Sequence, residues 1–121
     1  MKNRLQTIGA IAAITLFSSM AVVERANAAT YFYKGSEILS LCESSNTYEA
    51  NDCLEWLMGV SDTLEAMNSW GSFKDVCVPG GVTAGQLRKV IIQGLNKEPQ
   101  KLHLSASSLA IPVLANAFPC D

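Results

Sequence analysis

The sequence predicts an all-α fold, a small bundle of about four helices stapled by two disulfides. Apolar residues recur at spacings of three and four over most of the chain beyond residue 35, and this spacing gathers side chains on one side of a helix. Residues that favour helix starts precede these runs, and no segment predicts a sheet. The chain also contains four cysteines, an even number that allows two bridges.

The first 28 residues have the three parts of a secretory signal. Lys2 and Arg4 give a basic start, residues 5–23 are mostly apolar, and the small-residue triplet at 26–28 ends in Ala28. The strongly apolar part is shorter than the ~20 residues that a membrane span needs. We therefore expect cleavage after Ala28, and export by the general secretory route because the basic start lacks an arginine pair.

The expected mature domain, residues 29–121, is one small acidic unit. Its 93 residues hold 6 basic and 10 acidic side chains, which gives a net charge of −4. A core of this size gives a thin margin of stability, and small exported domains often add disulfides for that reason. The charge disfavours nucleic acid as a partner and favours a protein with a basic face.

The first helix is predicted over residues 35–42, with Ser36 as its cap. Four of its residues should face inward: Ile38, Leu39, Leu41 and Cys42. The polar residues 44–47 predict a loop. Before the helix, the aromatic cluster at 31–33 is expected to pack onto the core.

The second helix is predicted from an apolar stripe at spacings of four, three, four and three. Its members are Cys53, Leu57, Val60, Leu64 and Met67. Asn51 or Asp52 is expected to cap this helix, and residues 68–74, which include Gly71, should end it.

The third helix is predicted from residue 84 to about residue 96. Thr83 and Gln86 have the spacing of a capping box. The residues expected to face inward are Leu87, Val90, Ile91 and Leu95. Pro99 prevents this helix from continuing far.

The last helix is predicted to begin near Leu104 or Ser105. Pro112 falls inside it. Proline cannot donate a backbone hydrogen bond to the carbonyl of Ser108 and crowds that turn, so we expect either a kink or a break there.

Four cysteines allow three disulfide pairings. Cys42 closes the first predicted helix and Cys53 opens the second, 11 positions later, so we expect these two to pair. Cys77 and Cys120 then pair by elimination. The short and long loops closed in this way would contribute roughly 3 and 4 kcal/mol to stability.

Little in the chain points to catalysis. No two cysteines are closer than 11 positions, which argues against a four-cysteine zinc site. A nucleophilic pair of Cys77 and His103 is disfavoured, because an even cysteine count in an exported chain favours disulfides. Asp62 and Glu65 form a solvated acidic face at least as readily as an acid–base pair. We expect no enzymatic activity, no metal and no cofactor.

Motifs along the mature domain support a more specific interpretation. Residues 33–42 read Tyr-x-Gly-x-x-x-Leu-x-Leu-Cys, and residues 76–87 read Val-Cys-Val-Pro-x-x-Val-Thr-x-x-Gln-Leu. The other matching positions are Cys53, Gly59-Val60-x-Asp62, Pro99, Ser105-Ala106, Leu109 and Ala117-Phe118-Pro119-Cys120. Over nearly all of the mature domain, this pattern resembles the Rap/Tai immunity-protein family.

The resemblance implies a small all-helical periplasmic protein, often dimeric, that plugs the active-site cleft of a peptidoglycan amidase delivered by type VI secretion. The chain departs from the family at Gln93-Gly94, where a tyrosine is usual, and at Pro112. Toxin-contacting residues vary within the family, so none is carried over to this chain.

We therefore expect a periplasmic immunity protein whose partner is a cognate amidase, with homodimerisation left open and no membrane contact after signal cleavage. The acidic stretch at 43–65 is the expected contact face, and Glu49, Glu55 and Asp62 are its candidate partner-binding residues. The alternatives are a periplasmic acid-stress chaperone, which would also be small, helical and disulfide-bonded, and a family member of non-immunity function.

Overall fold

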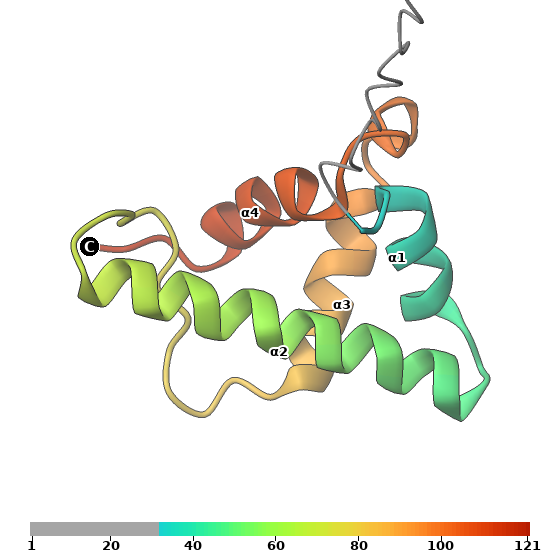
Figure 1. The fold of residues 1–121 in the computed structure, drawn as a ribbon, viewed down its shortest axis with the longest axis horizontal. Coiled ribbons are helices and arrows are strands. Elements are labelled where there is room, and N and C mark those ends of the chain that lie inside the picture. Colours follow the sequence, from blue (N-terminus) through green and yellow to red (C-terminus); the bar gives the residue numbers. More distant parts are fainter. Residues whose placement is uncertain (1–31) are drawn as a thin grey trace, which may run out of the picture.

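The computed structural model describes residues 32–121, in which four helices surround one core (Figure 1). The helices are α1 (Gly35–Glu43), α2 (Thr47–Ser69), α3 (Ala84–Leu95) and α4 (Ala106–Ala117), with a short 3-10 turn at Pro99–Lys101. The predicted all-α fold is confirmed, and within residues 32–121 the only strand-like pairing is an isolated bridge between Lys34 and Ser105. The predicted signal peptide, residues 1–28, lies outside the described residues.

The core lies where α1 and α3 meet the other helices. Each of these two packs against the remaining three helices, whereas α2 and α4 are held together mainly through them. Figure 1 shows α2 as the longest helix, running along one edge of the molecule with α3 crossing behind it. The buried apolar residues are Ile38, Leu39, Cys42, Cys53, Leu57, Leu64, Val76, Leu87, Ile91, Leu95, Ala106, Leu109, Ala110 and Leu114.

The start of α1 differs from the prediction. Lys34, not Ser36, is the N-cap residue, and its backbone N–H donates to Oε2 of Glu37 at 2.7 Å. Ser36 is instead inside the first turn, where its N–H donates to the carbonyl of Leu102 at 2.9 Å. The cap therefore depends on a glutamate three residues into the helix.

The start of α2 also differs. Asn46 caps this helix by accepting a hydrogen bond from the N–H of Tyr48 at 2.9 Å, so the prediction of Asn51 or Asp52 was wrong. The helix begins before its first buried residue, Cys53, because the Asn46 side chain satisfies a free N–H earlier in the chain. The added turn is solvent-exposed, so the apolar stripe did not mark it.

The prediction of α3 and its capping box is confirmed. The N–H of Thr83 donates to Oε1 of Gln86 at 2.7 Å, and the N–H of Gln86 donates to Oγ1 of Thr83 at 3.2 Å.

A break at Pro112 was one of two expectations, and it is wrong because α4 runs unbroken from Ala106 to Ala117. Pro112 is exposed, while Leu109, Ala110 and Leu114 on either side of it are buried. Burial of these neighbours offsets the lost hydrogen bond and holds the helix together.

Both predicted disulfides are present. Cys42–Cys53 joins the end of α1 to α2 and is completely buried. Cys77–Cys120 ties the extended segment before α3 to the carboxyl end and closes a separation of 43 residues. Beside it, the N–H of Cys77 donates to the carbonyl of Phe118 at 2.8 Å. Cys77 is exposed, so the two bridges differ in their access to solvent.

We predict that the two disulfides are reduced in order of their exposure. Cys77–Cys120 should open at low reductant concentration, because a thiolate can reach its sulfur atoms in the folded protein. Cys42–Cys53 should open only when the domain unfolds. Alkylation of the freed thiols, followed by mass spectrometry at increasing reductant concentration, measures this order. Labelling of all four cysteines in a single step would contradict the prediction.

The end of α1 is closed by a side chain from α3. The last turn of α1 has no basic residue of its own. Arg88 donates from Nε to the carbonyl of Cys42 at 2.6 Å and from Nη2 to the carbonyl of Ser44 at 3.1 Å. The guanidinium satisfies free carbonyls and places a positive charge at the negative end of the helix dipole.

Replacing Arg88 with methionine should lower the free energy of unfolding by about 1–3 kcal/mol, because two carbonyls lose a charged donor. Arg88→Lys should recover only part of this, because an ammonium cannot reproduce the forked geometry. Urea unfolding measures both effects. Lys89→Met is the matched control, and an equal loss of stability in this neighbour would show that general charge, not the two hydrogen bonds, is responsible.

Helices α3 and α4 approach closely at Gly94. A Cβ atom placed there would overlap the side chain of Val113 on α4. The residue pair at which this chain departs from the Rap/Tai pattern, Gln93-Gly94, therefore lies at a tight helix crossing. Only a residue without a side chain fits against Val113 in this arrangement.

Gly94→Ala should destabilise the domain by about 1–3 kcal/mol through overpacking. The double variant Gly94→Ala/Val113→Ala should regain a substantial part of the loss, because the second change removes the atoms that clash. Thermal unfolding of the two single variants and the double variant forms a complete cycle. Additive losses in the double variant would show that the two residues do not compete for the same space.

Candidate interaction surface

The described residues contain little that could carry chemistry. Within residues 32–121, no group of three or more His, Cys, Asp and Glu side chains is placed to hold a metal ion. Cys77 is in a disulfide, and Nδ1 of His103 lies 3.0 Å from the carbonyl oxygen of Gln100. The same part of the chain has no helix long and apolar enough to cross a membrane.

Two shallow depressions lie on the surface of residues 32–121. One lies beside α1 and is lined by Phe32, Tyr33, Ser36, Glu37, Ser40, Leu41 and Glu49. The other is lined by Cys42, Glu43, Leu54, Gly85, Arg88, Lys89 and Ile92. In the first, Phe32 is 99% exposed, so the expectation that the aromatic cluster packs onto the core is wrong for this residue. In the second, Arg88 already donates a hydrogen bond to the carbonyl of Cys42 at the end of α1.

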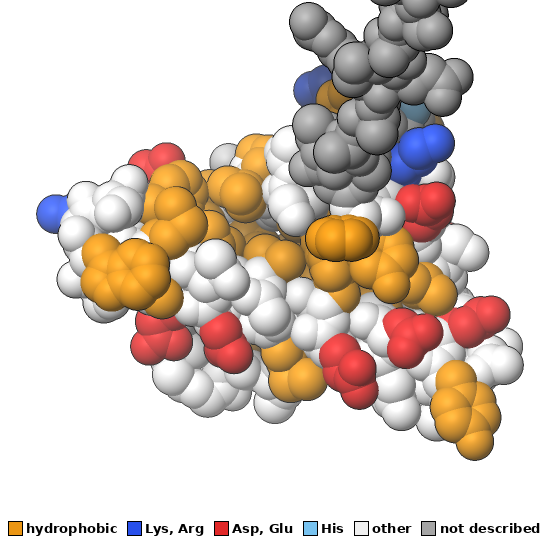
Figure 2. All heavy atoms as spheres, viewed as in Figure 1, with side chains coloured by type: hydrophobic (Ala, Val, Ile, Leu, Met, Phe, Trp, Pro, Cys, Tyr) orange, Lys and Arg blue, Asp and Glu red, His pale blue; other side chains and the backbone are white. Residues whose placement is uncertain are grey.

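Helix α2 carries more charged residues than any other helix in the described part of the chain. Its 23 residues include five carboxylates and no basic residue. Figure 2 shows acidic side chains in a row along this helix, below a strip of hydrophobic side chains. Within residues 32–121 the one ion pair joins Lys101 to Glu98, so no cation pairs with the carboxylates of α2.

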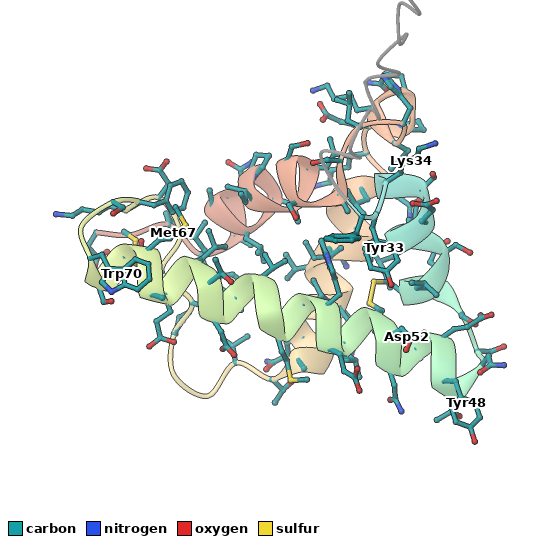
Figure 3. The ribbon with its side chains drawn as sticks, viewed as in Figure 1. Tyr33, Lys34, Tyr48, Asp52, Met67 and Trp70 are labelled. Carbon is teal, nitrogen blue, oxygen red and sulfur yellow. A yellow bond between two sulfur atoms is a disulfide. The ribbon has the colours of Figure 1, made fainter. Side chains whose placement is uncertain are left out.

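One side of α2 faces away from the core along the whole helix. We call it the outer stripe and define it by residues at spacings of three and four, opposite Cys53, Leu57 and Leu64. Its members are Tyr48, Asp52, Glu55, Gly59, Asp62, Ala66 and Trp70. Tyr48 is 83% exposed and Trp70 is 76% exposed, and Figure 3 shows them extending from opposite ends of the helix.

The geometry of the outer stripe suits protein recognition. Its two aromatic residues are about 33 Å apart along the axis, from the helical rise of 1.5 Å per residue. Tyrosine and tryptophan are enriched among residues that dominate binding energy at protein interfaces. Between them lie three carboxylates and two small residues, so the stripe combines apolar ends with an acidic and flat middle.

The candidate partner-binding residues are only partly brought together. Glu55 and Asp62 are both exposed and lie two turns apart on the outer stripe. Glu49 points to a different side of α2, because six residues separate it from Glu55 and each turns the helix by ~100°. Its carboxylate also accepts a hydrogen bond from Oγ of Ser44 at 2.5 Å, which occupies one oxygen.

Of the seven members of this surface, sequence reasoning named only Glu55 and Asp62 as partner-binding residues. Asp52 was interpreted as a cap, Gly59 was noted only as a position of the Rap/Tai pattern, and Tyr48, Ala66 and Trp70 were assigned no individual role. The signal was present in the sequence, because the same three-and-four spacing that marks the buried stripe also marks the opposite side. The early start of α2 at Thr47 and the position of Trp70 at its end were needed to place Tyr48 and Trp70 on that side.

A family model of Rap1a immunity proteins matches residues 34–120. This range begins at the N-cap residue of α1 and ends at the last cysteine, so it includes all four helices and both disulfides. No curated protein and no solved structure gives a significant match. Because the matched range covers well over half of the sequence, the chain belongs to the Rap1a immunity protein family.

Proposed function

We propose that the protein is a periplasmic immunity protein that binds a peptidoglycan amidase delivered by type VI secretion and blocks its active-site cleft. The match to the Rap1a immunity protein family is the observation that carries this proposal. Membership implies a protective role against a secreted effector without catalysis. The amidase is the effector class that the Rap/Tai resemblance implies.

Two features of the chain support a periplasmic location. Peptidoglycan lies outside the cytoplasm, so a protein that guards it must be exported, and residues 1–28 have the pattern of a secretory signal. The two disulfides also fit an oxidising compartment, because cytosolic thiols are kept reduced.

A rigid obstacle is sufficient for this function. Inhibition by occlusion needs no reactive group, but it loses affinity if loops must be ordered during binding. The disulfides and the Arg88 contacts hold the ends of α1 and α4 and the segment before α3 in place before any partner arrives. The uncompensated charge of α2 would also speed association with a basic surface.

The decisive experiment is an inhibition assay with protein purified from the periplasm of cells that express the full precursor. Each type VI peptidoglycan amidase of the source strain and its close relatives is tested on isolated peptidoglycan. We expect one amidase to be blocked at equimolar inhibitor, and light scattering of the complex to report whether one or two copies of the inhibitor are bound.

Two controls define the outcome. Co-expression in cells should prevent lysis by a periplasmically targeted amidase, and deletion of residues 2–28 should abolish protection by retaining the inhibitor in the cytoplasm. Failure to inhibit any of these amidases at a large molar excess would contradict the proposal. Increased dye binding and broad capture of unfolded proteins only at acidic pH would favour the acid-stress chaperone.

A further inference from the structure

Gly59 is exposed on α2, and nothing in the described chain packs against it. Glycine is one of the poorest residues for a helix interior, and Gly59 lies in the middle of a 23-residue helix. Three other glycines have evident reasons, because Gly71 and Gly81 have φ values of +73° and +94° and Gly94 lies against Val113. A Cβ atom on Gly59 would have nothing within 4 Å.

The surroundings of Gly59 make it the flattest point of the outer stripe. Glu55 and Asp62 lie one turn away on either side, and Tyr48 and Trp70 stand at the two ends. Figure 3 shows Asp52 on the same helix between the two aromatic side chains. A partner segment that crosses α2 here can approach its backbone, while carboxylates flank the crossing point.

We propose that a cationic surface of the amidase docks along the outer stripe, with one segment crossing α2 at Gly59 and other parts of the same surface contacting Trp70 and Tyr48. This inference rests on the proposed function and adds the docking surface and the charge of the surface that it recognises. Lysine or arginine side chains on both flanks of that segment would pair with Glu55 and Asp62. The aromatic ends would supply apolar contact area.

The negative charge of the outer stripe determines which kind of partner can bind there. Two copies of this chain related by a two-fold axis at α2 would place carboxylates opposite carboxylates, which is repulsive. Nucleic acid and anionic membranes are repelled for the same reason. Helix α2 has no cation to offset this, so a basic protein surface is the complementary occupant.

The sharpest test is Gly59→Gln in the periplasmically purified protein. Glutamine is a good helix former, so the melting temperature should rise by about 2–6 °C. Binding to the amidase identified in the inhibition assay should weaken at least about tenfold, because the side chain blocks the close approach. Met58→Gln, at the neighbouring residue that points elsewhere, is the control and should leave affinity within about twofold.

The charge of the outer stripe is tested by kinetics. Glu55→Lys and Asp62→Lys should each slow association at least about threefold at low salt, and the difference should shrink as salt is raised. Glu98→Lys changes net charge equally but lies outside α2, so it should have little effect. Trp70→Ala should speed dissociation at least about tenfold.

The outcomes separate the surface from the function. If the wild-type protein inhibits the amidase and the Gly59, Glu55 and Trp70 variants inhibit equally well, the docking surface is wrong and the immunity function stands. If Gly59→Gln lowers the melting temperature, the glycine has a role in folding and the inference is overturned without any partner. Stabilisation together with weakened binding supports it.

Discussion

The corner between α1 and α2 is the constraint on which the rest of the structure depends. The buried Cys42–Cys53 bridge joins the two helices covalently, and Arg88 reaches from α3 to the carbonyls of the same corner. Because three of the four helices meet at this point, the corner fixes the direction of α2 relative to the core. The direction of α2 in turn decides which of its side chains remain in solvent.

Much of this fold could be predicted from the sequence, because its main signals are local. The stripe from Cys53 to Leu64 and the Thr83–Gln86 capping box each depend on residues within one helix. The disulfide pairing could also be predicted, because Cys42 and Cys53 are only 11 positions apart, on either side of the connection between α1 and α2. The two helix starts that were predicted wrongly depend on which of several neighbouring polar residues forms the cap. Glu37 determines the cap at Lys34, and Asn46 starts α2 ahead of its apolar stripe.

The candidate surface was predicted less completely for a related reason. Acidic residues were evident in the sequence, but their grouping depends on the helical phase and on where α2 begins and ends. Glu55 and Asp62 share a side, whereas Glu49 is turned away and bonded to Ser44. From sequence alone, a tryptophan at a helix end is expected to be buried in the core. Only the structure shows that Trp70 is exposed to solvent.

The two sides of α2 have different roles, and this difference affects how the sequence of the protein can evolve. Cys53, Leu57 and Leu64 are buried in the core, while the exposed residues of the outer stripe make no contribution to it. Substitutions there can accumulate singly, without compensating changes elsewhere in the fold. By contrast, a side chain added at Gly94 would require a smaller residue in place of Val113. The exposed side of α2 can therefore change as the toxin changes, while the core and the fold stay the same.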